Sequence, residues 1–294
     1  MASQWDKLKR ALAKPDPPNV LATAADALLS CVVRGDCMIG ILPIDAMDDV
    51  ITALRRVAQA GLTEGRDGLA DLLAALAQQG LTHTTYEADT LAALASLPDR
   101  EAKLLAARTW MYRDDKEHAE QAIAIAREGC DDDDNGRAHV LLGYMTFRGF
   151  GTGADPQESF RLHEIAAQRG NADGMFELYV FLSTGQGVAK DEARALQWCE
   201  RAAAQDHGRA LYNMGSFHAT GRGVAQDRVC ALEFYLRASE AGHGPASAAA
   251  GVMLWTGEGT KTDRARARQL FGLAGDQGYD AEALLDAVGI APEE

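Results

Sequence analysis

Small and apolar residues recur in the second half of the chain at a fixed interval of 36 residues. In one copy, Ala138, Leu142 and Gly143 are spaced i, i+4 and i+5, which places them on one face of a helix. The same pattern returns at Gly174, Leu178 and Tyr179, at Ala210, Met214 and Gly215, and at Ala246, Ala250 and Gly251. An uninterrupted period of this length predicts a solenoid, in which each repeat covers the apolar face of its neighbour.

Each copy is expected to form two helices. A Gly-x-Gly step, first seen at Gly149 and Gly151, ends the first helix because glycine readily adopts the left-handed conformation of a helix C-terminus. An aspartate then starts the second helix, where its carboxylate can accept hydrogen bonds from free backbone N–H groups. The four aspartates at this position are Asp155, Asp191, Asp227 and Asp263. The second helix is expected to bury Trp198 or its equivalent and to end at a glycine, with Asp206 as the exception.

Apolar periodicity also predicts helices before the repeats. Their expected ranges are 1–14, 19–34, 43–60, 65–79, 86–97, 101–112 and 116–128. The sequence has no alternating strand pattern, so the fold class is predicted as all-α. The predicted organisation is an N-terminal helical region, built of stacked pairs or as a compact helical domain, a degenerate repeat with an acidic linker, four repeats and a C-terminal capping helix. The corresponding ranges are 1–98, 99–136, 137–278 and 279–294.

The repeat resembles the Sel-one-like repeat, a relative of the tetratricopeptide repeat. The small residues of the first helix, the Gly-x-Gly step, the N-cap aspartate and the alanine pair Ala202–Ala203 carry this resemblance, which covers about residues 136–279. It implies a right-handed α-α superhelix that acts as a scaffold or adaptor for protein–protein interaction. The sequence departs from the family pattern at His163 and Cys199, which replace an aromatic residue, and at Thr152 and Thr260, which replace a valine.

The charge balance limits the partners that the chain can bind. Lys and Arg number 29 against 43 Asp and Glu, giving a net charge of −14. Nucleic acids and anionic membrane surfaces attract basic proteins, so neither is an expected partner. A protein or peptide is expected instead, and the acidity favours a basic one. The five cysteines have no regular spacing and no targeting segment is recognisable, which favours a cytoplasmic protein.

An acidic run before the first repeat has a partial metal-binding pattern. Asp131, Asp133 and Asn135 match the first half of a calcium loop, but the twelfth position, which requires a bidentate Glu, is Leu142. We therefore predict no metal and no cofactor, and keep a calcium site at these residues as the weaker alternative. The run is expected to be a linker in which Asp134 or Asn135 caps the next helix.

Candidate partner-binding residues lie on the first helix of each repeat, which lines the concave side in solenoids of the resembled family. Positions away from the packed seam carry aromatic, aliphatic and arginine side chains, and Tyr, Trp and Arg in particular anchor partners at interfaces. They are Tyr144, Phe147, Arg148, Phe176, Val180, Arg209, Tyr212 and Trp255. The alternative is that several of them pack against the adjacent helix, which the pattern of one helix face does not decide.

The leading hypothesis is a non-catalytic adaptor, or a regulatory or immunity-type binding protein, that grips its partner on the concave face. No nucleophile–base spacing supports catalysis. One alternative is β-lactam binding or hydrolysis, which the resemblance links to members with a cysteine pair in each repeat. Here the repeats hold only Cys199 and Cys230, at non-equivalent positions. Self-assembly through the first 98 residues is a third hypothesis, and the sequence leaves the oligomeric state open.

Overall fold

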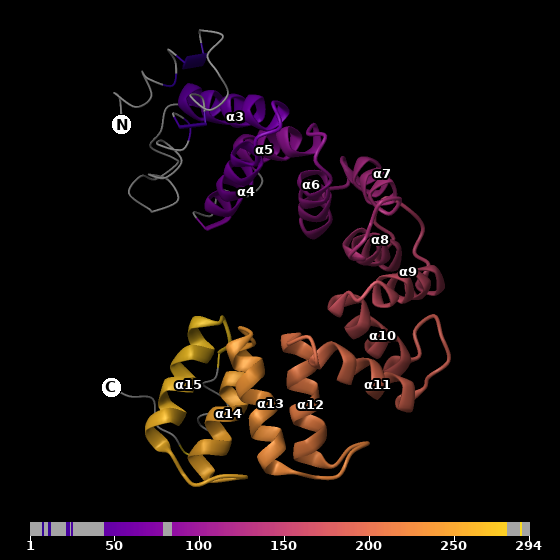
Figure 1. Cartoon of the computed structure of the whole chain (residues 1–294), viewed down its shortest axis with the longest axis vertical. Coiled ribbons are helices and arrows are strands. Elements are labelled where there is room, and N and C mark those ends of the chain that lie inside the picture. The colour runs from indigo at the N-terminus through magenta and orange to yellow at the C-terminus, as the bar shows by residue number, and fades with distance from the viewer. Residues whose placement is uncertain are drawn as a thin grey trace. The chain divides into compact units, whose positions relative to one another are not determined.

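The computed structural model describes residues 8, 11–12, 22–23, 25, 44–78, 84–280 and 289. Within these residues every regular element is a helix, from α3 to α15, which confirms the predicted all-α class (Figure 1). The predicted helices at 1–14, 19–34 and 279–288 lie largely outside the described residues. The chain divides into an N-terminal unit, residues 1–131 and 150–153, and a repeat unit, residues 132–149 and 154–294.

The N-terminal unit contains five of the described helices. They are α3 (Ile44–Gln59), α4 (Thr63–Gln78), α5 (Thr85–Ala95), α6 (Arg100–Tyr112) and α7 (Ala119–Gly129). Helix α7 begins three residues later than predicted, at Ala119 instead of Lys116. The Asp115 carboxylate accepts hydrogen bonds from the backbone N–H groups of Glu117 and His118, which holds this segment in a separate turn.

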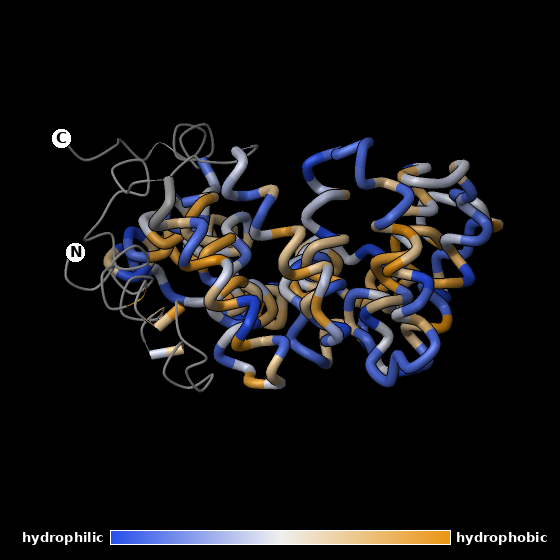
Figure 2. The backbone as a smooth tube through the Cα atoms, turned by 90° about the horizontal axis from the view of Figure 1, so that it is seen from above, coloured by the Kyte–Doolittle hydropathy of each residue, from blue (hydrophilic) through white to orange (hydrophobic). Residues whose placement is uncertain are grey.

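The repeat unit contains four helix pairs in sequence order, as predicted. They are α8 (Arg137–Arg148) with α9 (Pro156–Gln168), α10 (Ala172–Thr184) with α11 (Glu192–Ala203), α12 (Gly208–Thr220) with α13 (Arg228–Glu240), and α14 (Gly244–Thr256) with α15 (Arg264–Asp276). We call α8, α10, α12 and α14 the first helices, and their partners the second helices. Hydrophobic residues are concentrated in the helices, whereas the connecting loops are mostly hydrophilic (Figure 2).

The two glycines of each Gly-x-Gly step are needed for different physical reasons. The first glycine of each step ends a first helix in the left-handed conformation, as Gly149 does with a φ of 71°. The second glycine allows a close approach to the preceding repeat: a Cβ at Gly187 would lie 2.6 Å from the carbonyl of Pro156. Asp206, the predicted exception at the end of a second helix, adopts the same left-handed conformation, with a φ of 56°.

The N-cap aspartates are confirmed in all four repeats. The Asp155 carboxylate accepts hydrogen bonds from the N–H groups of Gln157 and Glu158, and the other three each accept one from the residue three positions on. The backbone N–H of each aspartate also donates to a carbonyl near the end of the first helix, for example Asp227 to His218 at 2.9 Å. The aspartate therefore fixes the loop as well as the helix that follows it.

Replacing one of these caps should weaken the unit measurably. The Asp227→Ala variant is expected to lower the free energy of unfolding by about 1 kcal/mol, because the N–H of Cys230 loses its acceptor. Urea denaturation followed by circular dichroism measures this loss. Asp227→Asn keeps an acceptor oxygen and serves as the control, and an equal loss in both variants would contradict the capping role.

Small residues of the first helices make room for aromatic rings of the second helices. A Cβ at Gly215 would lie 2.7 Å from the Tyr235 ring, and one at Gly251 would lie 2.5 Å from the Phe271 ring. Gly143 faces the ring of His163 in the same way. Glycine at these positions therefore lets each second helix pack closely on its partner.

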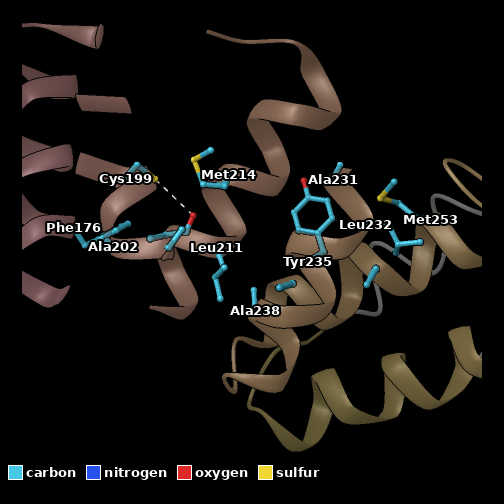
Figure 3. Close-up of a cluster of buried hydrophobic side chains, with 14 of the residues drawn as sticks. Phe176, Cys199, Ala202, Leu211, Met214, Ala231, Leu232, Tyr235, Ala238 and Met253 are labelled. Carbon is cyan, nitrogen blue, oxygen red and sulfur yellow. Dashed lines mark hydrogen bonds between the residues drawn. The ribbon is translucent and has the colours of Figure 1, made fainter. Parts of the chain in front are cut away.

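In the second repeat, the large residue lies on the first helix and the small residue on the second helix. Tyr179 occupies the glycine position on the first helix, and Cys199 occupies the aromatic position on the second. Cys199 is a fully buried member of the core that runs from Ala167 to Phe271 (Figure 3). Tyr179 is partly buried and packs against this core. Burial raises the pKa of the Cys199 thiol to about 12, so it is neutral and behaves as a small apolar group.

The prediction that Trp198 is a core residue needs correction. Its side chain is only partly buried against the core, and the Arg201 guanidinium lies 4.7 Å from the centroid of its ring. The residue after it, Cys199, takes the inward direction instead. Trp198 is therefore a rim residue covered by an arginine.

Candidate functional site

Three of the four first helices are linked to one another through Glu177. Its Oε1 accepts a hydrogen bond from the Tyr144 hydroxyl at 2.8 Å and lies 3.5 Å from Nη1 of Arg209. These residues come from α8, α10 and α12, so one carboxylate bridges three consecutive repeats. The Glu177 side chain is only 11% exposed, whereas that of Arg209 is 56% exposed. The bridge therefore has a buried centre and a solvent-facing arginine.

Burial dominates the electrostatics of this bridge. It raises the pKa of the Glu177 carboxyl above its usual value, against the lowering effects of the Tyr144 hydrogen bond and the Arg209 charge. Burial, together with the neighbouring Glu177 carboxylate, also raises the pKa of Tyr144. The tyrosine thus stays a protonated donor. A carboxylate that accepts from fixed partners holds the side chains around it in defined positions.

A second contact network surrounds Phe176. The His207 ring stacks on the Phe176 ring with centroids 4.8 Å apart, and the Arg209 guanidinium lies 4.3 Å from the Phe176 centroid. Nδ1 of His207 accepts a hydrogen bond from the N–H of Ala210, so its proton lies on Nε2, 3.1 Å from Oδ1 of Asp173. The hydrogen bond from His207 lowers the pKa of Asp173, which keeps that carboxylate ionised.

The predicted partner-binding residues differ in solvent exposure. Phe147, Arg148 and Arg209 are exposed, the first of them by 37%. Tyr144, Val180, Tyr212 and Trp255 are half-buried. Phe176 is only 3% exposed, which favours the alternative that its side chain packs within the protein. It lies under His207 and Arg209 and supports the exposed arginine.

Sequence reasoning missed Glu177, Asp173 and His207. A signal for Glu177 was present, because the equivalent positions hold Leu141, Asn213 and Ala249, and only this copy has a charge. The contacts of His207 depend on its position as N-cap of α12, next to the preceding repeat, and one helix pattern does not reveal them.

Side chains of the acidic run form hydrogen bonds within the protein. Oδ2 of the buried Asp133 accepts from the backbone N–H of His139 at 3.0 Å and from its Nδ1 at 2.6 Å. Burial alone would raise the pKa of Asp133, but the hydrogen bonds from His139 lower it below its usual value. Asn135 accepts from the N–H of Arg137. The N-cap position of α8 is Gly136, not Asp134 or Asn135 as predicted. The side chains of Asp133 and Asn135 accept from N–H groups of the first turn.

Neither a metal cluster nor a membrane span is found in the described part of the chain. No three His, Cys, Asp or Glu side chains there are arranged to hold a metal ion, and the calcium alternative at Asp131, Asp133 and Asn135 receives no support from the contacts above. Among the same residues, no helix has both the length and the apolar character that crossing a bilayer requires.

Comparison with known proteins identifies the repeat. The Sel1 repeat family model matches residues 136–171, 172–207, 208–243 and 245–279. A Sel1 repeat protein from Oxalobacter formigenes is 30% identical, with a TM-score of 0.53 over 61% of this chain and 71% of that one. No curated protein sequence matches the chain.

Two further solved structures are similar at lower identity. A protective antigen of uropathogenic Escherichia coli with an SLR fold is 17% identical, with a TM-score of 0.51 over 96% of this chain and 66% of that one, and shows the fold alone. An immunity protein from Pseudomonas aeruginosa is 16% identical over 98% of this chain and 92% of that one, and its TM-score of 0.41 supports no functional inference. The four family matches and the 30% identical relative show that this chain belongs to the Sel1 repeat proteins.

Proposed function

We propose that this chain is an adaptor that binds a partner protein on the surface of its first helices. Sel1 repeat proteins are generally non-catalytic scaffolds for protein–protein interaction. The observation that favours the first helices is the bridge from Tyr144 through Glu177 to Arg209, which fixes side chains across three repeats. Fixed side chains lose little conformational freedom when a partner binds.

The residue types on this surface support the proposal. Phe147 is exposed beside the Phe181 ring, with centroids 5.6 Å apart, and Arg209 is held over Phe176. Aromatic and arginine side chains on a rigid base are typical of interface hot spots. The net charge of −14 favours a partner of opposite overall charge, while the surface itself carries both signs, so local contacts of both signs are expected.

Affinity capture with a matched control tests the proposal. The Phe147→Ala/Arg209→Ala variant should lose a partner that the wild type captures from lysate of the source cells, as identified by mass spectrometry. Ile165→Ala/Arg161→Ala is the control, because Ile165 on a second helix is 37% exposed, the same fraction as Phe147. With the purified partner, the first variant should weaken binding by at least tenfold, equivalent to about 1.4 kcal/mol. Retention of the partner by both variants would place the contact elsewhere on the chain.

A further inference from the structure

Two acidic side chains of α10 lie beside one arginine of α12. Asp173 and Glu177 are four residues apart, so they share one face of the helix, and like charges at this spacing repel each other. Arg209 occupies the position equivalent to Asp173 in the next repeat, which places these two residues side by side on neighbouring first helices. The structure nevertheless pairs the arginine with Glu177, one turn further along α10. Asp173 is therefore a second carboxylate beside this guanidinium group.

The two carboxylates lie in opposite environments. Glu177 is buried, and its Oε1 accepts from the neutral Tyr144 hydroxyl, whereas Nη1 of Arg209 is 3.5 Å away, at the limit of a hydrogen bond. A buried carboxylate with one neutral donor and one distant cation is poorly compensated. The Asp173 side chain is 63% exposed, and its Oδ1 lies 3.1 Å from Nε2 of His207. Water and the histidine thus stabilise the charge of Asp173.

These environments shift the pKa values of the two carboxyl groups in opposite directions. Burial, with a smaller contribution from the Asp173 charge, raises the pKa of Glu177 above its usual value of 4.5. The hydrogen bond from His207 lowers the pKa of Asp173 below its usual value of 3.8, and the charges of Arg209 and Arg137 act in the same direction. In the pH interval between the two pKa values, Glu177 is protonated and Asp173 is ionised.

His243 faces Arg209 from the fourth repeat. Its ring packs against the Tyr212 ring, with centroids 4.9 Å apart. Burial lowers the pKa of His243, and the charges of Arg209 and His207 lower it further. This imidazole therefore stays neutral at pH values where an exposed histidine is charged, and in that range it does not repel the arginine.

We propose that Glu177 and Asp173 form a two-position switch for Arg209, in which proton uptake by Glu177 in mild acid moves the guanidinium group to Asp173. Protonation removes the charge that holds the arginine at Glu177, while the Tyr144 hydroxyl can still donate to the neutral carboxyl group. His207 occupies Oδ1 of Asp173, so Oδ2 is the oxygen that accepts from the arginine. One carboxylate then no longer bridges three repeats.

The switch changes the surface that the proposed function assigns to the partner. Arg209 is a proposed partner contact, and its guanidinium group lies 4.3 Å from the centroid of the Phe176 ring while it is paired with Glu177. A partner that contacts Arg209 therefore meets a different arrangement of charge in mild acid. This effect on binding rests on the proposed function, whereas the movement of the arginine does not.

Nuclear magnetic resonance of the purified, isotope-labelled full-length protein tests the switch. In a titration from pH 7 to pH 4, the carboxyl carbon signal of Glu177 should have a midpoint above 4.5, and the Nε–Hε signal of Arg209 should change with the same midpoint. Glu177→Gln keeps an oxygen that accepts from Tyr144, so its Arg209 signal should already lie at the acid position at pH 7 and should not titrate. Backbone amide signals of the repeats show at each pH that the protein is folded.

A second variant identifies the acid-side partner of the arginine. In Asp173→Asn, the Glu177 titration should persist at a lower pH, because a neighbouring negative charge is gone, and the Arg209 signal in acid should differ from that of wild type. Glu240→Gln is the matched control, because it makes the same type of change at an exposed position of α13 and should leave both titrations as in wild type.

Four results would overturn the proposal. They are a Glu177 midpoint at or below 4.5, an Arg209 signal that stays constant while Glu177 titrates, an Arg209 titration that persists in Glu177→Gln, and an acid-state Arg209 signal that is the same in Asp173→Asn as in wild type. Because none of these measurements needs a partner, the switch can fail while the capture experiment succeeds, and the reverse.

Discussion

Replacing Cys199 with tyrosine is expected to lower the free energy of unfolding by about 3 kcal/mol, although tyrosine is the residue at the equivalent position of the third repeat. There, the ring of Tyr235 lies where a Cβ at Gly215 would be only 2.7 Å away. In the second repeat, the position equivalent to Gly215 is Tyr179, which has a Cβ and a ring. A tyrosine at position 199 therefore has no free space.

Tyr179→Gly alone should also destabilise the protein, but combined with Cys199→Tyr it should restore part of the stability lost. Tyr179→Gly removes a partly buried ring and places glycine in a helix, with an expected loss of about 3–4 kcal/mol. The double variant restores the glycine–aromatic pair of the third repeat, so it should be less destabilised than the sum of the single losses by about 2–3 kcal/mol. Urea denaturation of the four proteins at pH 7 provides the double-mutant cycle.

A control pair tests whether this coupling is local. Tyr179→Gly combined with Phe271→Cys changes the same two kinds of position, one on a first helix and one on a second helix, but in different repeats, and the losses should add to within about 0.5 kcal/mol. If the Cys199→Tyr/Tyr179→Gly protein lost the full sum of its single losses, the two positions would not share one space. The size exchange of the second repeat would then need another explanation.

The sequence predicted the features that depend on the local backbone and recur in every copy. The helix pairs, the N-cap aspartates and the left-handed glycines follow from short-range physical rules, and repetition removed the ambiguity of each single instance. Asp206, which replaces the glycine at the end of a second helix, fits the same rule, because aspartate tolerates the left-handed conformation better than most residues.

The features that escaped prediction depend on what the next repeat contributes. Phe176 and Tyr212 occupy equivalent helix positions, yet Phe176 is buried and Tyr212 half-buried. Each ring meets a histidine of the next repeat, His207 on Phe176 and His243 on Tyr212. Phe176 is also covered by Arg209, 33 positions further along, whereas the position equivalent to Arg209 in the next repeat is Pro245. A helical pattern shows which face a residue shares, but not which neighbours cover that face.

The capping of α8 shows a similar limit. Asp133 lies six residues before His139 and reaches its N–H because Gly136 adopts a φ of 73° between them. The turn at Gly136 returns Asp133 to the start of α8. A rule that looks for the cap directly before the helix would choose Asp134 instead. Burial of its carboxylate, at 2% exposure, depends on contacts such as the donation from Arg169 to the Asp133 carbonyl oxygen at 2.5 Å.

His163 should make the protein less stable in mild acid. It occupies an aromatic position, is 1% exposed, and donates from Nδ1 to the carbonyl oxygen of Ser159 at 2.8 Å. Its Nε2 is buried without a hydrogen-bond partner among the described residues. Burial lowers the pKa of His163 to about 4, so the folded state resists protonation where the unfolded state accepts it.

The sign of the effect follows from this difference in proton binding. Between pH 6.5 and 4 the unfolded chain holds a proton on this imidazole and the folded chain does not, so the free energy of unfolding falls as the pH falls. A difference of about 2.5 pH units at about 1.4 kcal/mol for each unit gives a full loss of about 3.5 kcal/mol. About 3 kcal/mol of this is lost by pH 4, where half of the folded molecules are already protonated. At neutral pH the imidazole is uncharged in both states, and the protonation penalty is absent.

The His163→Phe variant isolates this contribution from the other acid-sensitive groups. At pH 7 it should exceed wild type in stability by about 1 kcal/mol, because the unpartnered acceptor is gone. At pH 4 the advantage should grow to about 4 kcal/mol, since only wild type carries the protonation penalty. Urea denaturation at both pH values measures the difference.

A converse variant completes the test. Phe271 lies against Gly251 as His163 lies against Gly143, so Phe271→His should introduce a new acid sensitivity of the same sign into the fourth repeat. A stability difference between wild type and His163→Phe that is the same at pH 7 and pH 4 would contradict the prediction. It would mean that the folded protein protonates His163 as readily as the unfolded chain does, and that the ring reaches water despite its position between α8 and α9.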